Sequence, residues 1–167
     1  QERSFYPDGD VDQARFREFF WQLSWRAPHI EPNTALIARD ETYPTQLSTV
    51  AAALNLAYPP PASEPYNLAY WAYRIQPDAE PATSLPTSLQ NQYRTMFFNA
   101  NAADSLVLFQ KPDSSSCLWV LNEADQLNPD IPENLRAQIP LSNIARIQSL
   151  PANEGYPPVI MFGEAPI

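Results

Sequence analysis

The sequence predicts an α/β fold: a mixed central sheet of about five strands with helices on both faces, a three-layer sandwich. Two short runs, Leu106 to Phe109 and Cys117 to Leu121, are apolar at successive positions, which is typical of strands covered on both faces. Two other segments repeat apolar residues at helical spacing. With 44% hydrophobic residues and 12% aromatic residues, the 167-residue chain can bury a sizeable core.

The first predicted element is an amphipathic helix at residues 10–26. Asp10 can cap its amino end, and Pro28 ends it because the residue before a proline is steered out of the helical region. Its buried face is marked by four large side chains at i, i+3, i+4 and i+7: Phe16, Phe19, Phe20 and Leu23. Trp21 and Trp25 lie beside this stripe, and they either widen the buried face or form an exposed aromatic patch.

A buried strand at residues 34–38 (TALIA) and a second helix come next. The helix opens at Pro44 and Thr45, and three consecutive prolines, 59–61, stop it abruptly. A strand, an acidic turn and a helix in this order form the first half of a βαβ unit.

The rest of the chain supplies four more strands and a third helix. The strands are predicted at 66–75, 93–98, 105–110 and 116–121, and the last two are expected to form a hairpin. Residues 76–87 are predicted as a Pro-rich surface loop. A short helix begins at Pro132 with Leu135 and Ile139 inward, and 151–167 form an irregular tail. We expect residues 1–167 to be one domain.

Composition argues against several functional classes. The net charge is -9, with a single lysine and nine scattered arginines, whereas nucleic-acid binders concentrate positive charge. Three glycines and one histidine, His29, leave no Gly-rich phosphate loop, no nucleophile elbow and no site needing two imidazoles. Cys117 is the only cysteine, and because it lies in the apolar run 116–121 we expect it to be buried rather than reactive. We predict no nucleic-acid partner, no cofactor, no metal and no catalytic residue.

One ligand site is predicted from two groups of side chains. Asp40 and Glu41 follow the strand 34–38, and open α/β sheets tend to hold ligands beyond the carboxyl ends of their strands. Rings that could stack on a sugar or peptide crowd nearby in the sequence: Tyr66, Tyr70, Trp71 and Tyr73. The alternative for both groups is a solvated turn and an aromatic core.

A second acidic segment, 123–133, is rich in oxygen ligands but lacks the central glycine of a calcium loop. Capping and turn formation explain its Asp125, Asn128 and Asp130 more simply.

A family resemblance is carried by residues Arg15 to Ile37, RFREFFWQLSWRAPHIEPNTALI, and by three later pieces, 48–58, 96–121 and 139–144. These segments resemble a soluble domain of uncharacterised bacterial multi-pass membrane proteins. The resemblance implies an extracytoplasmic module, tethered to the cell membrane through the transmembrane region of its own parent chain. Because the chain begins at Gln1 without a methionine, we expect it to be part of a longer protein.

The functional expectation is a non-catalytic domain that binds a carbohydrate, a lipid-linked ligand or a protein partner. Two alternatives stay open. One is a small carboxylate-dependent enzyme that uses Asp40 and Glu41. The other is a structural or oligomerisation module.

Overall fold

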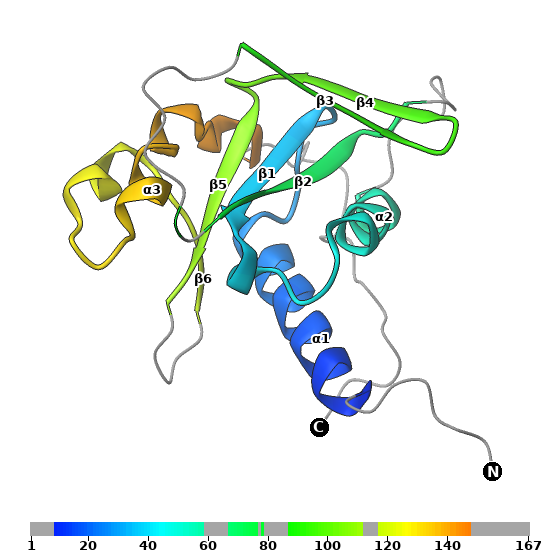
Figure 1. The fold of residues 1–167 in the computed structure, drawn as a ribbon, viewed down its shortest axis with the longest axis horizontal. Helices are drawn as coiled ribbons and strands as arrows, with labels where there is room; N and C mark the ends of the chain where they lie inside the picture. Colours follow the sequence, from blue (N-terminus) through cyan, green and yellow to red (C-terminus); the bar gives the residue numbers. More distant parts are fainter. Residues whose placement is uncertain (1–8, 59–66, 77, 79–86, 112–116, 148–167) are drawn as a thin grey trace.

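The structure is a computed structural model that describes residues 9–58, 67–76, 78, 87–111 and 117–147. In these residues it is an α/β fold, as predicted, with a mixed four-stranded sheet and a separate two-stranded antiparallel hairpin (Figure 1). The order in the central sheet is β2-β1-β5-β6, formed by Tyr70–Ile75, Thr34–Arg39, Ser105–Gln110 and Leu118–Val120. The hairpin pairs β3 (Ser88–Tyr93) with β4 (Met96–Asn101).

The predicted βαβ unit is present. Strand β1 lies parallel to β2 through the helix α2 (Leu47–Ala57), and it is also parallel to β5 on its other side. The predicted hairpin of the last two strands is confirmed, because β6 runs antiparallel to β5. Every residue of β1 and β5 except the last is buried, as expected for central strands covered on both faces.

Two layers cover the sheet. Helix α1 (Gly9–Arg26) and α2 pack on one face, where Leu36, Leu106 and Leu108 point toward them. The opposite face is covered by the short helix α3 (Glu133–Arg136) and by the β3–β4 hairpin. Leu135 and Ile139 are buried there, as predicted. Helices therefore lie on both faces, but the hairpin completes the second layer.

The predicted strand at 93–98 is wrong. Two strands meet at this point, and the two-residue turn Arg94–Thr95 reverses the chain between Tyr93 and Met96. Arg94 has φ 56, a left-handed conformation that usually goes to Gly or Asn. Without either residue, the segment carries none of the usual hairpin signals.

The bounds of the other predicted strands differ less from those in the structure. Strand β2 begins at Tyr70, where the Asn55 side chain accepts hydrogen bonds from the Ala69 and Tyr70 amides. Most of the predicted loop 76–87 and the whole tail 151–167 lie outside the described residues.

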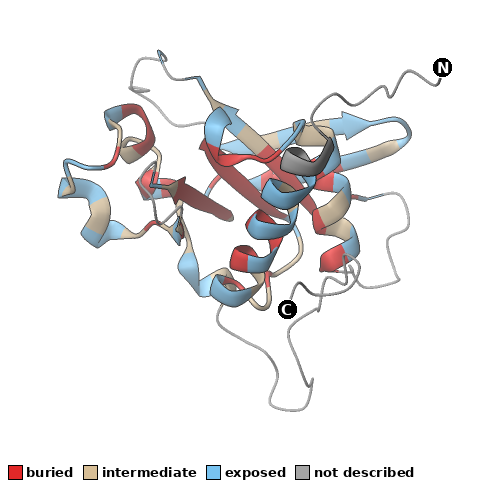
Figure 2. Ribbon diagram, turned by 90° about the horizontal axis from the view of Figure 1, so that it is seen from below, coloured by how far each residue is buried: buried red, intermediate tan, exposed pale blue. Residues whose placement is uncertain are grey.

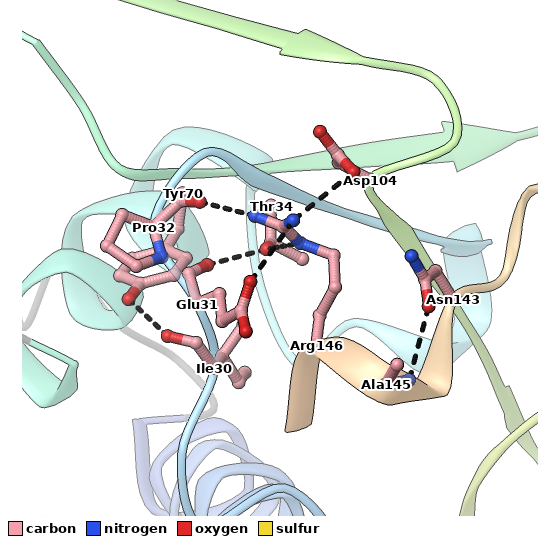
Figure 3. Close-up of polar contacts among 9 residues, drawn as sticks. All are labelled: Ile30, Glu31, Pro32, Thr34, Tyr70, Asp104, Asn143, Ala145 and Arg146. Atoms are coloured by element: carbon pink, nitrogen blue, oxygen red, sulfur yellow. Dashed lines mark hydrogen bonds and ion pairs between the residues drawn. The ribbon is translucent and has the colours of Figure 1, made fainter. Parts of the chain in front are cut away.

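Arg146 ties the last described segment to the start of the sheet (Figure 3). Its guanidinium forms ion pairs with Glu31 at 3.4 Å and with Asp104 at 3.2 Å. It also donates hydrogen bonds to the Thr34 hydroxyl and to the carbonyl of Pro32. The Arg146 side chain is only 13% exposed, so this cluster joins three separate chain segments in a largely buried setting.

Three buried tyrosines hold the layers together through hydroxyl-to-carbonyl hydrogen bonds. The single O–H of Tyr43 is shared between the carbonyls of Leu36 and Tyr73, Tyr58 donates to the carbonyl of Ala27, and Tyr70 donates to that of Ile30. Burial raises the pKa of all three hydroxyls, that of Tyr70 to about 12.

The raised pKa values of these tyrosines predict that the folded protein loses stability in alkali. The unfolded chain loses phenolic protons from pH about 10, whereas the folded protein keeps that of Tyr70 to about 12. The free energy of unfolding should therefore fall as pH rises above about 10. Urea unfolding at increasing pH measures this, and Tyr70→Phe should make the decline shallower. An unfolding midpoint that stays constant up to pH about 11.5 contradicts the prediction.

Candidate functional site

The two predicted carboxylates lie just beyond the carboxyl end of β1, in a 3-10 turn at Asp40–Thr42. Both are exposed, and each contacts an arginine. Asp40 pairs with Arg74 at 3.3 Å, and Glu41 pairs with Arg39 at 2.9 Å. The negative charge of each carboxylate is therefore balanced by an arginine at the surface.

The predicted rings do not join these carboxylates. Tyr70 is 2% exposed and Trp71 is 6% exposed, and they point to opposite faces of the sheet. Tyr70 pairs with Thr34, six residues before Asp40, so about 20 Å of strand separates them along β1. Tyr73 is half-buried against Phe98. Tyr66 lies outside the described residues.

A half-open cleft of about 550 Å³ lies at the same edge of the sheet, between the ends of β1 and β5 and helix α1. Its lining residues come from α1, from the turn and loop after β1, and from the end of β5: Ala14, Arg15, Glu18, Phe19, Thr42, Pro44 and Gln110. Strands β1 and β5 are parallel neighbours, so their carboxyl ends lie side by side here. Open α/β sheets tend to hold ligands beyond the carboxyl ends of their strands. The cleft lies at the edge of the sheet where the sequence predicted a site, but its lining includes neither the predicted carboxylates nor the described predicted rings.

Charged and amide groups converge on this cleft. The Arg15 guanidinium donates a hydrogen bond to the Glu41 carbonyl at 3.3 Å and so holds α1 against the turn after β1. The Glu18 carboxylate accepts a hydrogen bond from the Gln22 amide at 2.7 Å. Gln110, the last residue of β5, adds an amide, and the buried ring of Phe19 adds an apolar wall. Such a mixture suits a small polar ligand.

Two exposed tryptophans continue the surface along α1. Figure 2 shows this long helix buried along one side and exposed along the other. On its exposed side Trp21 is 59% exposed and Trp25 is 72% exposed, with ring centroids 6.1 Å apart. Glu18 precedes Trp21 by three residues and Trp25 by seven, so helical spacing places all three on the same side. The rings that the sequence left undecided form an exposed patch beside the cleft.

A third tryptophan lies on the neighbouring edge strand. Trp119 of β6 is 48% exposed, and the Arg26 guanidinium lies over its ring at 4.4 Å. The Gln22 side chain accepts a hydrogen bond from the Leu118 amide, which fixes β6 against α1. We call Trp21, Trp25 and Trp119 the tryptophan surface.

Sequence reasoning missed Trp119, Arg15, Glu18 and Gln110 as site residues. Of these four, only Trp119 could have been found from the sequence, because side chains alternate along a strand and Trp119 therefore faces the other way from its buried neighbour Leu118.

The acidic segment 123–133 serves local structure. Asn122 and Asp125 form a reciprocal capping box, and the Asn128 side chain accepts a hydrogen bond from the Asp130 amide. Throughout the described part of the chain, no group of three or more His, Cys, Asp or Glu side chains is placed to hold a metal ion.

No family model, no curated protein and no solved structure matches this chain. Among the helices that the structure describes, none combines the length and the hydropathy needed to span a membrane.

Proposed function

We propose that this chain is a non-catalytic binding domain that holds a sugar-containing ligand along helix α1. The observation that carries the proposal is the pair of exposed rings, Trp21 and Trp25, on the side of α1 that also lines the polar cleft. Aromatic rings stack on the apolar faces of sugars. Carboxylate, guanidinium and amide groups hydrogen-bond to sugar hydroxyls.

Exposure of these tryptophans has a free-energy cost that a purely structural role does not explain. Large apolar side chains contribute roughly 1.5–3 kcal/mol when they are buried. The same helix buries Phe19, Phe20 and Leu23 completely or nearly so. Contiguous exposed apolar surface rimmed by polar groups is typical of interaction sites.

We also propose an extracytoplasmic setting, with the domain attached to a bacterial membrane protein. The support is the resemblance of residues Arg15 to Ile37 to a segment of such proteins. This segment forms most of α1 and most of β1, so it supplies the helical part of the proposed binding surface and a central strand. The transmembrane region of the parent chain is then a partner of the domain, and a lipid-linked sugar is one form that the ligand can take.

A protein partner is the second candidate occupant. Trp and Arg are the residues most enriched at the energetic centres of protein interfaces, and Arg26 over Trp119 fits that description. The enzyme alternative has less support, because Asp40 and Glu41 are engaged by arginines outside the cleft lining. An oligomerisation module would bury the tryptophan surface against a second copy of the chain.

The proposal is tested by replacing both rings, Trp21→Ala with Trp25→Ala. Isothermal titration with cellotriose and trigalacturonate should show binding to the unmodified chain. The double variant should bind about tenfold more weakly, because each lost aromatic contact is worth about 0.5–1.5 kcal/mol. Phe97→Ala is the matched control, since Phe97 is an exposed ring on β4 that contributes nothing to the cleft.

Two results would contradict the proposal. One is the absence of binding to any sugar. The other is binding that the double variant retains in full. Concentration-dependent dimerisation that the double variant abolishes would instead assign the tryptophan surface to a second copy of the chain.

A further inference from the structure

Helix α1 carries a cluster of arginines without carboxylate partners. Arg15, Arg17 and Arg26 are exposed, and none forms an ion pair with a described carboxylate. Three arginines elsewhere in the described residues, Arg39, Arg74 and Arg146, do form such pairs. Of the described arginines that form no such pair, three lie on α1, which also bears Trp21 and Trp25, and the other two, Arg94 and Arg136, lie elsewhere.

These arginines border the exposed tryptophans. Arg17 precedes Trp21 by one helical turn, which makes the two side chains neighbours on the helix surface. Arg26 follows Trp25 directly in the chain, and its guanidinium lies over the ring of Trp119. Arg15 lines the cleft beside Glu18. A ligand stacked on the tryptophans is therefore within reach of guanidinium groups on both sides.

The part of α1 beside the tryptophans carries more positive than negative charge. Residues 13–26 contain three arginines and one acid, Glu18, whereas the first turn of α1 adds Asp10 and Asp12 and the whole chain carries a net charge of -9. In an acidic protein, arginines that pair with no described carboxylate and lie beside exposed rings form a local attraction for anions. Guanidinium groups also bind carboxylates and phosphates through two parallel hydrogen bonds.

We infer that the ligand of this surface is an anionic sugar, one that bears a carboxylate or a phosphate group. The inference rests on the proposed function and adds the charge of the ligand to it. A nucleic acid shares the phosphate chemistry, but the rest of its backbone would face a strongly acidic chain. An anionic sugar carries its negative charge on a few atoms of one carboxylate or phosphate group, and the arginines of α1 are enough to bind that group.

The test compares four probes by isothermal titration with the full chain. Trigalacturonate supplies carboxylates, glucose 1-phosphate supplies a phosphate, cellotriose is neutral, and a single-stranded oligonucleotide represents nucleic acid. We expect trigalacturonate or glucose 1-phosphate to bind at least tenfold more tightly than cellotriose, and the tighter of the two identifies the anionic group. The affinity should fall as added salt shortens the Debye length from about 30 Å to about 8 Å.

Variants locate the effect. Arg17→Gln and Arg26→Gln should each weaken binding of the anionic probe about tenfold, because a charge-assisted hydrogen bond is lost. Arg17→Lys keeps the charge and should retain part of the affinity. Arg94→Gln is the control, since Arg94 is an exposed arginine that stacks on Tyr93 of the distant hairpin. All three positions are exposed, so the four variants should fold.

The outcomes separate the inference from the proposed function. If cellotriose binds as tightly as both anionic probes, the inference fails and the proposed function stands. If no sugar binds, both fail. Tighter binding of the oligonucleotide, lost in Arg17→Gln, would overturn the assignment to a sugar.

Discussion

Replacing Phe20 by alanine should lower the free energy of unfolding by about 3–5 kcal/mol. Phe20 is completely buried, and its ring packs against Phe16 at 4.8 Å and edge-on against Phe19 at 5.2 Å. It belongs to the core between the sheet and helices α1 and α2. The loss combines the transfer free energy of the ring with the cavity that it leaves.

Equilibrium urea unfolding measures this loss. Trp25→Ala on the same helix is the control, and it should change stability by no more than about 0.5 kcal/mol because its side chain faces water. Equal effects at the two positions would mean that α1 does not have one buried and one exposed face. The binding surface proposed for it would then have no basis.

Replacing Arg146 by methionine should cost about 3 kcal/mol. Removing one member of a buried ion pair costs about 3–5 kcal/mol, because the remaining charges stay without a partner. The lower end applies here, since Glu31 and Asp104 are partly exposed to water. The variant also leaves the Thr34 hydroxyl and the Pro32 carbonyl without the guanidinium that they contact.

Arg74→Met is the matched control for this prediction. Its ion pair with Asp40 is exposed at both ends, and exposed pairs contribute about 0–1 kcal/mol. A loss in Arg146→Met no larger than that in Arg74→Met would show that the cluster does not hold the 3-10 turn at Ile144–Ile147 against the sheet.

The elements with strong periodicity could be predicted from sequence. Helix α1 has one stripe of large side chains and ends two residues before Pro28, as predicted, but it begins at Gly9, so Asp10 lies inside the helix and does not precede it as a cap. Strands β1 and β5 are apolar at successive positions, and the structure covers both of their faces. In each element, the side chains that the local pattern marks as buried are the ones that the neighbouring elements cover.

The hairpin and the aromatic partners of the site could not be predicted. The turn Arg94–Thr95 has neither Gly nor Asn, so nothing in the sequence marks the reversal between β3 and β4. The first half of β2 is covered on both faces, and Tyr70 and Trp71 are core residues for that reason. The exposure of Trp21 and Trp25 depends on what packs against α1, which local sequence does not encode.

The central claim is that the exposed face of α1 binds the ligand, and one nuclear magnetic resonance titration tests it directly. The chain has four tryptophans and therefore four indole N–H signals. On addition of trigalacturonate, the signals of Trp21 and Trp25 should shift in a saturable manner. That of the buried Trp71 should stay in place. Saturable shifts confined to Trp71, or no shift of Trp21 and Trp25 when ligand is bound, would contradict the account.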